Sequence, residues 1–332
     1  MRFGSALALA GLLLAAPAAA QDASPLNARL SGDIAPTHDP VIAREGDTYY
    51  VFGTGLSSKT SRDLVHWTAG KRLFDALPEW ATQAIPGAKD AWAPDISFVN
   101  GRWRLYYAVS TFGSNRSAIG LATSPTLDPA ALGYGWRDEG LVLQSKPGDD
   151  YNAIDPNFVV DREGRHWLSF GSFWGGLKLV RLDPRTGKPL DPKAAPLAIA
   201  RRLVPAGAPA PVEAPFILAH GGWYWLFASY DYCCKGANST YYTVVSRAKS
   251  LKGPYRGKDG SPMLQGGGTV FLRADLPEKQ RFRGPGHPGF LHDKDGTDYV
   301  VYHAYDVENK GAPTLRIARI RWGKDGWPIA ED

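Results

Sequence analysis

One pattern occurs five times along the chain, and this repetition limits the possible folds more than any other feature of the sequence. Each copy contains a proline, a short apolar stretch, a polar turn with glycine, and an aromatic-rich stretch that ends in a small residue or histidine. In the last copy, His287-Pro288 is followed by the turn Asp295-Gly296 and by the run 299–303. The copies cover residues 39–53, 92–108, 155–171, 213–228 and 287–303.

Each copy predicts a β-hairpin, because two apolar or aromatic runs joined by a glycine-containing turn are typical of paired antiparallel strands. The spacing between copies leaves room for about four short strands per repeat. The 37 glycines and 26 prolines also disfavour an all-helical protein. The sequence therefore predicts an all-β fold, a five-bladed β-propeller. A β-sandwich or a solenoid with a coincidental repeat is the alternative.

The first 20 residues have the three parts of a secretory signal peptide. Arg2 supplies the charge, residues 6–16 form an apolar core, and small residues at 18–20 precede Gln21. The core is shorter than the roughly 20 apolar residues that span a bilayer, and no later stretch approaches that length. We therefore expect cleavage after Ala20, a single propeller domain at 21–332, no membrane association, and export to the periplasm or the medium.

Charge and cysteine content give few further constraints. The formal net charge of +5 comes from scattered residues, 38 Lys and Arg against 33 Asp and Glu, so we expect no nucleic-acid partner. The sequence does not define an oligomeric state, and a monomer is expected. The two cysteines, Cys233 and Cys234, are neighbours, which excludes a disulfide scaffold. Whether they are bridged is left open, and a loop feature without catalytic duty is the favoured interpretation.

The residues that open the five copies are the candidate functional residues. The first strand of each propeller blade lines the central channel, so these residues are expected to meet at one mouth. They are Asp39, Trp92, Asp155, Glu213 and His287. Acidic residues are depleted in strands and rarely buried unpaired, so three of them here indicate chemistry or ion binding. Asp95 lies further along its repeat and is expected to be structural.

Taken alone, each of these residues also has an ordinary structural interpretation. An aspartate before proline, such as Asp39, is usually a turn signal, and Trp92 would by default belong to the core. A single histidine such as His287 is more often a hydrogen-bonding residue than a metal ligand. Repetition at corresponding positions is what favours a site.

Three carboxyl groups at one mouth suit the hydrolysis of a glycosidic bond. That reaction needs one protonated carboxyl group as the acid and one ionised group as the base or nucleophile. A third carboxylate nearby raises the pKa of the acid toward the working pH. Trp92 offers a flat apolar face on which a sugar ring could stack. Nucleophile elbows of the Gly-x-Ser-x-Gly type and phosphate-binding loops are missing from the sequence.

At these residues the sequence resembles glycoside hydrolase family 43, and within it the endo-1,5-α-L-arabinanases. The resemblance extends over nearly all of the chain that follows the leader. The general motifs are His38-Asp39-Pro40, Trp92-Ala93-Pro94-Asp95, 153–157 and 212–216. Three further motifs resemble arabinanases rather than xylosidases of the family: Cys233-Cys234-Lys235-Gly236, 284–287 and 313–317.

The resemblance implies an inverting hydrolase with Asp39 as general base and Glu213 as general acid, and with Asp155 tuning and orienting Glu213. Inversion requires the carboxyl groups of Asp39 and Glu213 to lie roughly 6.5 to 9.5 Å apart, which leaves room for a water molecule. His287 matches a histidine that helps to hold a metal ion, commonly calcium, with water as the other ligands. One departure is Pro288, because many arabinanases have asparagine after this histidine.

The resemblance also implies substrate-binding residues and a substrate. The residues expected to contact the substrate are His38, Trp92, Phe112 and Trp174; simple packing is the alternative for Phe112 and Trp174. The expected activity is cleavage of internal α-1,5 linkages in arabinan, a side-chain polysaccharide of pectin.

Three other functions remain open at the level of sequence. An exo-acting α-L-arabinofuranosidase or β-xylosidase would share the fold, and the shape of the cleft would decide between them and an endo-acting enzyme. A non-catalytic carbohydrate-binding propeller would be expected to lack one of the three carboxylates, and all three are present. A propeller that binds other proteins gives no reason for the acidic residues.

Overall fold

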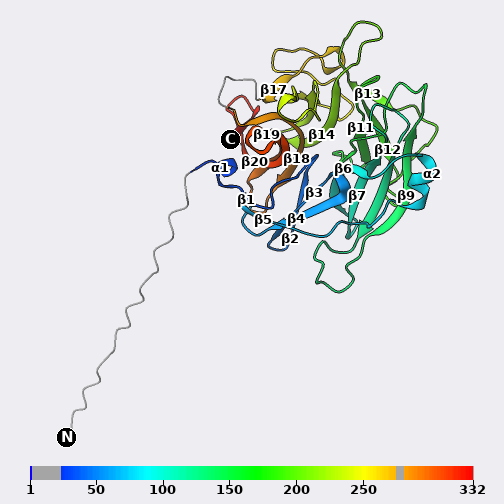
Figure 1. Ribbon diagram of the computed structural model, residues 1–332. Coiled ribbons are helices and arrows are strands. Elements are labelled where there is room, and N and C mark those ends of the chain that lie inside the picture. The colour runs from blue at the N-terminus through cyan, green and yellow to red at the C-terminus, as the bar shows by residue number, and fades with distance from the viewer. Residues whose placement is uncertain (2–23, 274–279, 332) are drawn as a thin grey trace.

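The computed structural model describes residue 1, residues 24–273 and residues 280–331. The predicted signal peptide, except for residue 1, and its cleavage site after Ala20 lie outside the described residues. Five β-sheets surround a common centre, which confirms the predicted five-bladed β-propeller (Figure 1). In the described part of the chain, no helix is both long enough and apolar enough to cross a membrane.

Every blade consists of strands that follow one another along the chain. Blade 1 contains β2 (Val41–Glu45), β3 (Thr48–Gly53), β4 (Ser57–Ser61) and β5 (His66–Ala69), with β1 (Ser31–Gly32) added beside β5. Blade 2 contains β6 (Ala91–Val99), β7 (Arg102–Val109), β8 (Ser117–Ser124) and β9 (Arg137–Ser145). Blade 3 contains β10 (Asn157–Val160), β11 (His166–Phe170), β12 (Leu177–Leu182) and β13 (Leu197–Ala200).

The last two blades follow the same order. Blade 4 contains β14 (Val212–His220), β15 (Trp223–Tyr230), β16 (Tyr242–Ala248) and β17 (Thr269–Leu272). Blade 5 contains β18 (Phe282–His292), β19 (Asp298–Asp306), β20 (Ala312–Trp322) and β21 (Pro328–Glu331). The helices among the described residues are short: α1 (Leu26–Arg29), α2 (Glu79–Ala84), η1 (Thr54–Leu56), η2 (Gly236–Asn238), η3 (Met263–Gln265) and η4 (Val307–Asn309).

The first long strand of each blade is the innermost one. β2, β6, β10, β14 and β18 form a closed ring in which each contacts the innermost strands of the two neighbouring blades. The antiparallel pairing places the start of an innermost strand opposite the end of the next strand, as with Ala91 and Val109 or Val212 and Tyr230. The loops after these second strands therefore lie at the same end as the predicted site. They are residues 54–56, 110–116, 171–176, 231–241 and 307–311.

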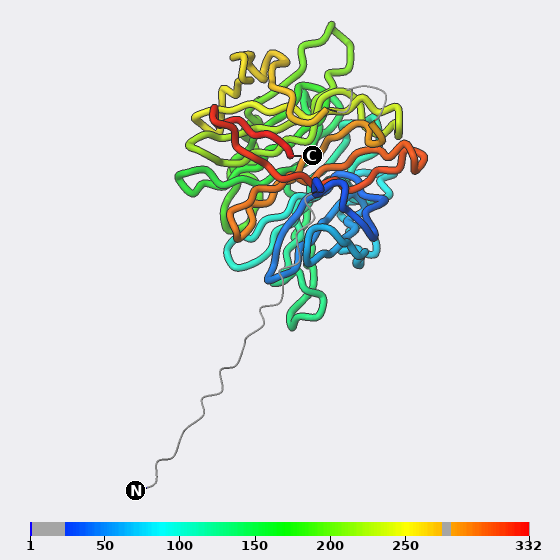
Figure 2. The backbone as a smooth tube through the Cα atoms, turned by 90° about the vertical axis from the view of Figure 1, so that its left-hand side faces the viewer, coloured from blue at the N-terminus to red at the C-terminus, as the bar shows by residue number. Residues whose placement is uncertain are grey.

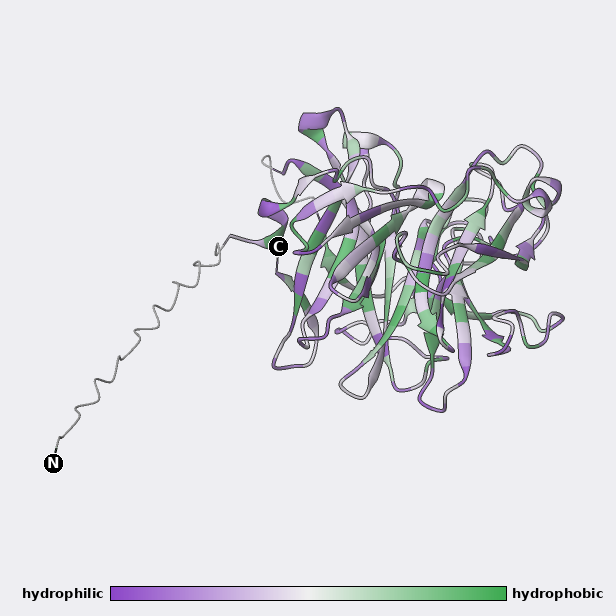
Figure 3. Cartoon of the chain, turned by 90° about the horizontal axis from the view of Figure 1, so that it is seen from below, coloured by the Kyte–Doolittle hydropathy of each residue, from purple (hydrophilic) through white to green (hydrophobic). Residues whose placement is uncertain are grey.

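The apolar core lies between the blades. Tyr106 of blade 2, for example, stacks on Phe158 of blade 3 with ring centroids 6.1 Å apart. Hydrophobic residues follow the strands, and hydrophilic residues gather in many of the loops (Figure 3). Burying these apolar faces against one another is the main favourable contribution to the packing of neighbouring blades.

The N-terminal segment closes the ring of blades. β1 pairs in parallel with β5 of blade 1. The backbone N–H of Thr37 donates to the carbonyl of Pro313 at 2.8 Å, and that of Leu315 donates to the carbonyl of Ile34 at 2.9 Å. The first described segment and the last blade consequently lie side by side, blue against red in Figure 2. The first blade is thus held to the last by backbone hydrogen bonds.

Candidate active site

In all five blades, the residue before the proline of the repeated pattern has the same unusual backbone conformation. It adopts a positive φ angle in each, which non-glycine residues seldom do. The five residues are Asp39 (50°), Ala93 (44°), Asp155 (56°), Ala214 (53°) and His287 (55°). Asp39, Asp155 and His287 therefore occupy equivalent positions, whereas Trp92 and Glu213 lie one residue earlier. The predicted ring thus combines two adjacent positions of the repeat.

Side chains of neighbouring blades hold four of these five residues in place. In four of the five cases the backbone N–H donates to a side chain of the preceding blade, blade 5 counting as the one before blade 1. The bonds are Asp39 to Nδ1 of His303 (3.1 Å), Ala93 to Oγ1 of Thr54 (3.1 Å), Ala214 to Oδ2 of Asp155 (3.0 Å) and His287 to Oγ of Ser229 (2.9 Å). The channel end of each blade is therefore tied to its neighbour, and the side chains at the centre are fixed in position.

Asp39 lies among polar groups that favour its ionised form. Its Oδ2 accepts a hydrogen bond from the Thr54 hydroxyl at 2.6 Å and lies 2.8 Å from Nδ1 of His38. Its Oδ1 lies 3.1 Å from Nδ1 of His287. Burial by itself would raise the pKa of Asp39, but the two histidines outweigh it and lower the pKa well below the usual value. Asp39 is consequently a carboxylate at neutral pH.

Glu213 and Asp155 have the opposite character. Burial raises the pKa of both carboxyl groups, although hydrogen bonds from Ser172 and Tyr241 offset part of the effect for Glu213. The Ser172 hydroxyl donates to Oε2 of Glu213 at 2.7 Å. Asp155 accepts the N–H of Ala214, the residue that follows Glu213. Asp155 therefore fixes the backbone that carries Glu213, and a proton can be retained on this pair at neutral pH.

His287 is positively charged in this environment. Burial would lower its pKa, but the Asp39 carboxylate outweighs burial and raises the pKa to about 9. The imidazolium of His287 therefore compensates the negative charge of Asp39 at the centre of the channel.

The four predicted substrate-binding residues lie in different surroundings. Both ring nitrogens of His38 have protein partners, Oδ2 of Asp39 and the hydroxyl of Tyr305, the latter at 2.9 Å. Trp92 is partly exposed on β6. Phe112 and Trp174 are 84% and 39% exposed, in two of the loops at the end of the propeller that carries the site. Contact of these four residues with substrate stays a prediction.

Several residues of the site were missed by the sequence analysis. Thr54, Ser172 and Ser229 each come directly after the closing residue of a copy, and His303 is itself such a residue. In an antiparallel hairpin, the end of the second strand lies beside the start of the first. The pattern therefore predicts that the residues that close the copies lie at the same end as those that open them. Of these four residues, only Thr54 contacts the opening residue of its own copy, whereas Ser172, Ser229 and His303 contact that of the following blade.

The surroundings of His287 suit a metal ion only if water supplies most ligands. Calcium takes six to eight oxygen ligands. Within the described residues, the groups of three or more potential ligand residues are His38 with Asp39 and His303, and His38 with the bridged Cys233 and Cys234. His287 belongs to neither group. It offers a single nitrogen, so the protein provides no cage for calcium around it.

One ionised and one protonatable carboxyl group at the mouth of a propeller are the groups needed by a carbohydrate-cleaving hydrolase. This defines the class of protein as a glycosidase. Comparison with known proteins identifies the family. The model of the glycosyl hydrolases family 43 matches residues 34–328, and the chain belongs to this family.

Proteins similar to this chain include enzymes and a solved complex. The extracellular exo-α-(1→5)-L-arabinofuranosidase ArbA of Cellvibrio japonicus is 43% identical, over 89% of this chain and 86% of its own length. The extracellular endo-α-(1→5)-L-arabinanase 1 of Bacillus subtilis is 40% identical, over 99% of this chain and 96% of its own. The α-L-arabinanase of Cellvibrio cellulosa complexed with arabinohexaose has a TM-score of 0.83 at 41% identity, covering 89% and 95% of the two chains.

Proposed function

We propose that the protein is an inverting hydrolase that cleaves internal α-1,5-L-arabinofuranosidic linkages of arabinan. The observation that carries this proposal is the contrast between Asp39, whose pKa is lowered, and Glu213, whose pKa is raised, at one mouth of the propeller. The substrate is inferred from the relatives: the Bacillus subtilis enzyme is named an endo-arabinanase and aligns with 99% of this chain.

In the proposed reaction, Asp39 accepts a proton from a water molecule as that water attacks the anomeric carbon. The bond between this carbon and the glycosidic oxygen breaks on the opposite side, and Glu213 donates its proton to the departing oxygen. Both residues then return to their starting states by proton exchange with solvent. A distance of roughly 6.5 to 9.5 Å between the two carboxyl groups is the expected geometry for this mechanism.

The contacts of Glu213 define how it would act as the acid. A carboxyl group donates its proton from one oxygen while the other remains an acceptor. The hydroxyl groups of Ser172 and Tyr241 both hydrogen-bond to Glu213, and that of Ser172 donates to Oε2, so the carboxyl group is held in one orientation. Asp155 holds the following backbone N–H and so orients the acid without taking part in proton transfer.

The proposal also includes export, a monomeric state and a bound ion. Two of the relatives are named extracellular, which supports secretion of this protein. A cation, most simply calcium, would bind His287 in its neutral form, displacing the proton that this imidazole carries when no ion is bound. Water would supply the other ligands, and the ion would order water at the channel centre. No step of the proposed reaction passes through this ion.

Exo-action is the second candidate, since the Cellvibrio japonicus relative, 43% identical, is named an exo-enzyme. Analysis of early products from linear α-1,5-arabinan tests the proposal. A mixture of oligosaccharides of different lengths supports internal cleavage, whereas a single short product from the first minutes would contradict it. Substitution Glu213→Gln tests the acid itself: full arabinan hydrolysis by this variant would rule out the assigned role and reopen the non-catalytic sugar-binding alternative.

A further inference from the structure

The neighbouring cysteines form a disulfide at the mouth of the site. Cys233 and Cys234 are bonded to each other in the loop between β15 and β16. Cys234 is exposed and has a φ angle of 67°, in the left-handed region. A disulfide between adjacent residues closes a small ring around one peptide bond, so it restricts the backbone of both residues. The direction of the Cys234 N–H is therefore held by the disulfide.

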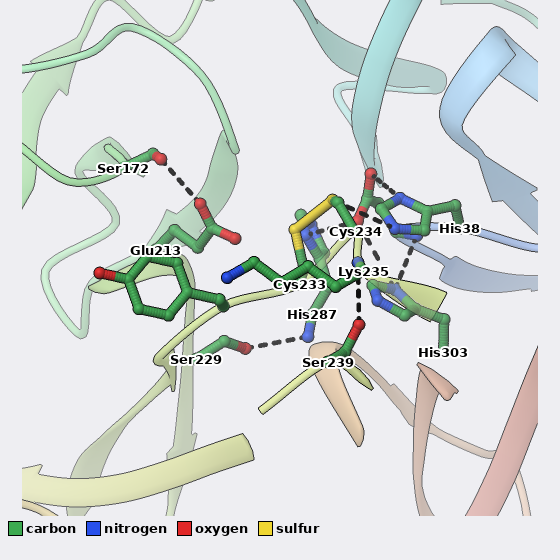
Figure 4. The surroundings of a disulfide bond; sticks show 12 residues. His38, Ser172, Glu213, Ser229, Cys233, Cys234, Lys235, Ser239, His287 and His303 are labelled. Carbon is green, nitrogen blue, oxygen red and sulfur yellow. Dashed lines mark hydrogen bonds and ion pairs between the residues drawn. A yellow bond between two sulfur atoms is a disulfide. The ribbon is translucent and has the colours of Figure 1, made fainter. Parts of the chain in front are cut away.

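This N–H begins a chain of hydrogen bonds that ends at Asp39. The N–H of Cys234 donates to the hydroxyl oxygen of Tyr305 at 2.7 Å. The same hydroxyl lies 2.9 Å from Nε2 of His38, whose Nδ1 lies 2.8 Å from Oδ2 of Asp39. In the view of Figure 4, the disulfide lies between Glu213 and the His38–His303 pair.

The first bond fixes the Tyr305 oxygen as an acceptor toward Cys234. A backbone N–H can only donate, so the Tyr305 oxygen accepts this bond and its own hydrogen is free to point toward Nε2 of His38. With the Tyr305 hydrogen directed to Nε2 of His38, Nε2 accepts it and a hydrogen on Nδ1 donates to Asp39. Tyr305 is only 2% exposed, so water does not readily replace either of its partners.

We propose that the Cys233–Cys234 disulfide and Tyr305 are positioning elements of the reaction, which hold His38 and thereby orient the Asp39 carboxylate toward the attacking water. This inference rests on the proposed role of Asp39 as the base. The Thr54 hydroxyl provides a second, independent hydrogen bond to the same carboxylate oxygen. Loss of the chain should therefore weaken catalysis without abolishing it.

Three variants test the inference on linear α-1,5-arabinan: Cys233→Ser/Cys234→Ser, Tyr305→Phe, and the combination of all three substitutions. Each is expected to lower kcat about fivefold, the effect of losing one hydrogen bond of about 1 kcal/mol, with less change in KM. The combined variant should be no slower than Tyr305→Phe alone, because the substitutions break one continuous chain. An unchanged kcat in the cysteine variant would overturn the inference. A combined variant whose loss of kcat equals the product of the losses in the cysteine variant and in Tyr305→Phe would also overturn it.

Reduction of the wild-type enzyme tests the disulfide without any substitution. Dithiothreitol is oxidised to its cyclic disulfide while the Cys233–Cys234 bond is reduced to two thiols, and kcat should fall to the level of the cysteine variant. Reoxidation should restore it. The cysteine variant is the matched control, because the chain has only two cysteines and the variant cannot respond to the reductant. The variant also contains no thiols that could capture a metal together with His38.

Two further measurements keep the result interpretable. Thermal unfolding of each variant shows whether the fold is intact, and reduction of the wild-type protein provides the readout if Tyr305→Phe does not fold. Asp39→Asn separates the two proposals. If this variant is inactive while the cysteine variant and reduced wild type keep full kcat, only the positioning inference fails. If Asp39→Asn keeps full activity, the proposed function and the inference are both wrong.

Discussion

Ser172 offers a direct test of Glu213 as the acid. Its side chain is 3% exposed, and its hydroxyl donates to Oε2 of Glu213 at 2.7 Å. The substitution Ser172→Ala removes this single hydrogen bond and leaves only a small cavity. The bond should become stronger as Glu213 loses its proton, because hydrogen bonds to ionised groups are stronger than those between neutral groups.

The size of the effect follows from this difference. A hydrogen bond between neutral groups contributes about 1 kcal/mol, and one to a charged group about 1.5 to 3 kcal/mol. The transition state, in which Glu213 is partly ionised, therefore loses about 1 kcal/mol more than the ground state does. Since about 1.4 kcal/mol corresponds to a factor of ten in rate, kcat should fall by roughly five- to tenfold with little change in KM.

The pH profile of kcat/KM provides the sharper assay. Glu213 must be protonated to act, so activity is lost as the pH rises through its pKa. The Ser172 hydrogen bond lowers this pKa, and its removal should move the alkaline limb of the profile to higher pH. The matched control is Ser246→Ala, because the buried hydroxyl of Ser246 has no hydrogen-bond partner among the described residues. This control should keep the wild-type kcat and profile.

Two results would refute the reasoning. An unchanged kcat in Ser172→Ala would mean that the hydrogen bond does not contribute to the transition state. A shift of the alkaline limb to lower pH would mean that the limb does not report on Glu213.

Three other predictions concern stability and ion binding. Burial raises the pKa of Asp95 to about 7. The contribution of Asp95 to folding stability is therefore fully present below the pKa of aspartate in the unfolded chain and is lost as the pH rises through about 7. Urea unfolding should therefore show Asp95→Asn gaining on the wild type between about pH 4 and pH 7, by up to about 4 kcal/mol; a constant difference would contradict this. Asn27→Ala should destabilise the protein by about 2 kcal/mol, because the N–H of Ile317 loses its acceptor, whereas exposed Asn309→Ala should be nearly neutral. After chelation, added calcium should raise the Tm of the wild type and not of His287→Gln, and an equal rise in both would exclude His287 as a ligand.

Much of the candidate site could be recognised from the sequence, because the repeats have polar or charged residues at corresponding positions. Asp39, Asp155 and His287 each precede a proline, and the structure gives all three the same backbone conformation. Glu213 and Trp92 lie one position earlier, a difference that the repeats alone did not resolve.

Other parts of the site depend on pairs of residues that no local pattern connects. Tyr305 lies far along the chain from Cys234 and from His38, yet its hydroxyl contacts both. The contrast in pKa between Asp39 and Glu213 likewise depends on the side chains that neighbouring strands place beside each of them.

The sequence by itself determined the number of blades, the all-β class and the three acidic side chains at the mouth, because each repeat contains the information for its own hairpin. Only the tertiary structure decided how the ring closes through residues 31–37 and how the cysteines join the site. It also showed the physical reason why Glu213 keeps its proton and Asp39 does not, an assignment that the family resemblance had implied. These features arise from contacts between blades. Burial and neighbouring charges there come from residues that are distant in the sequence, so the repeated pattern does not reveal them.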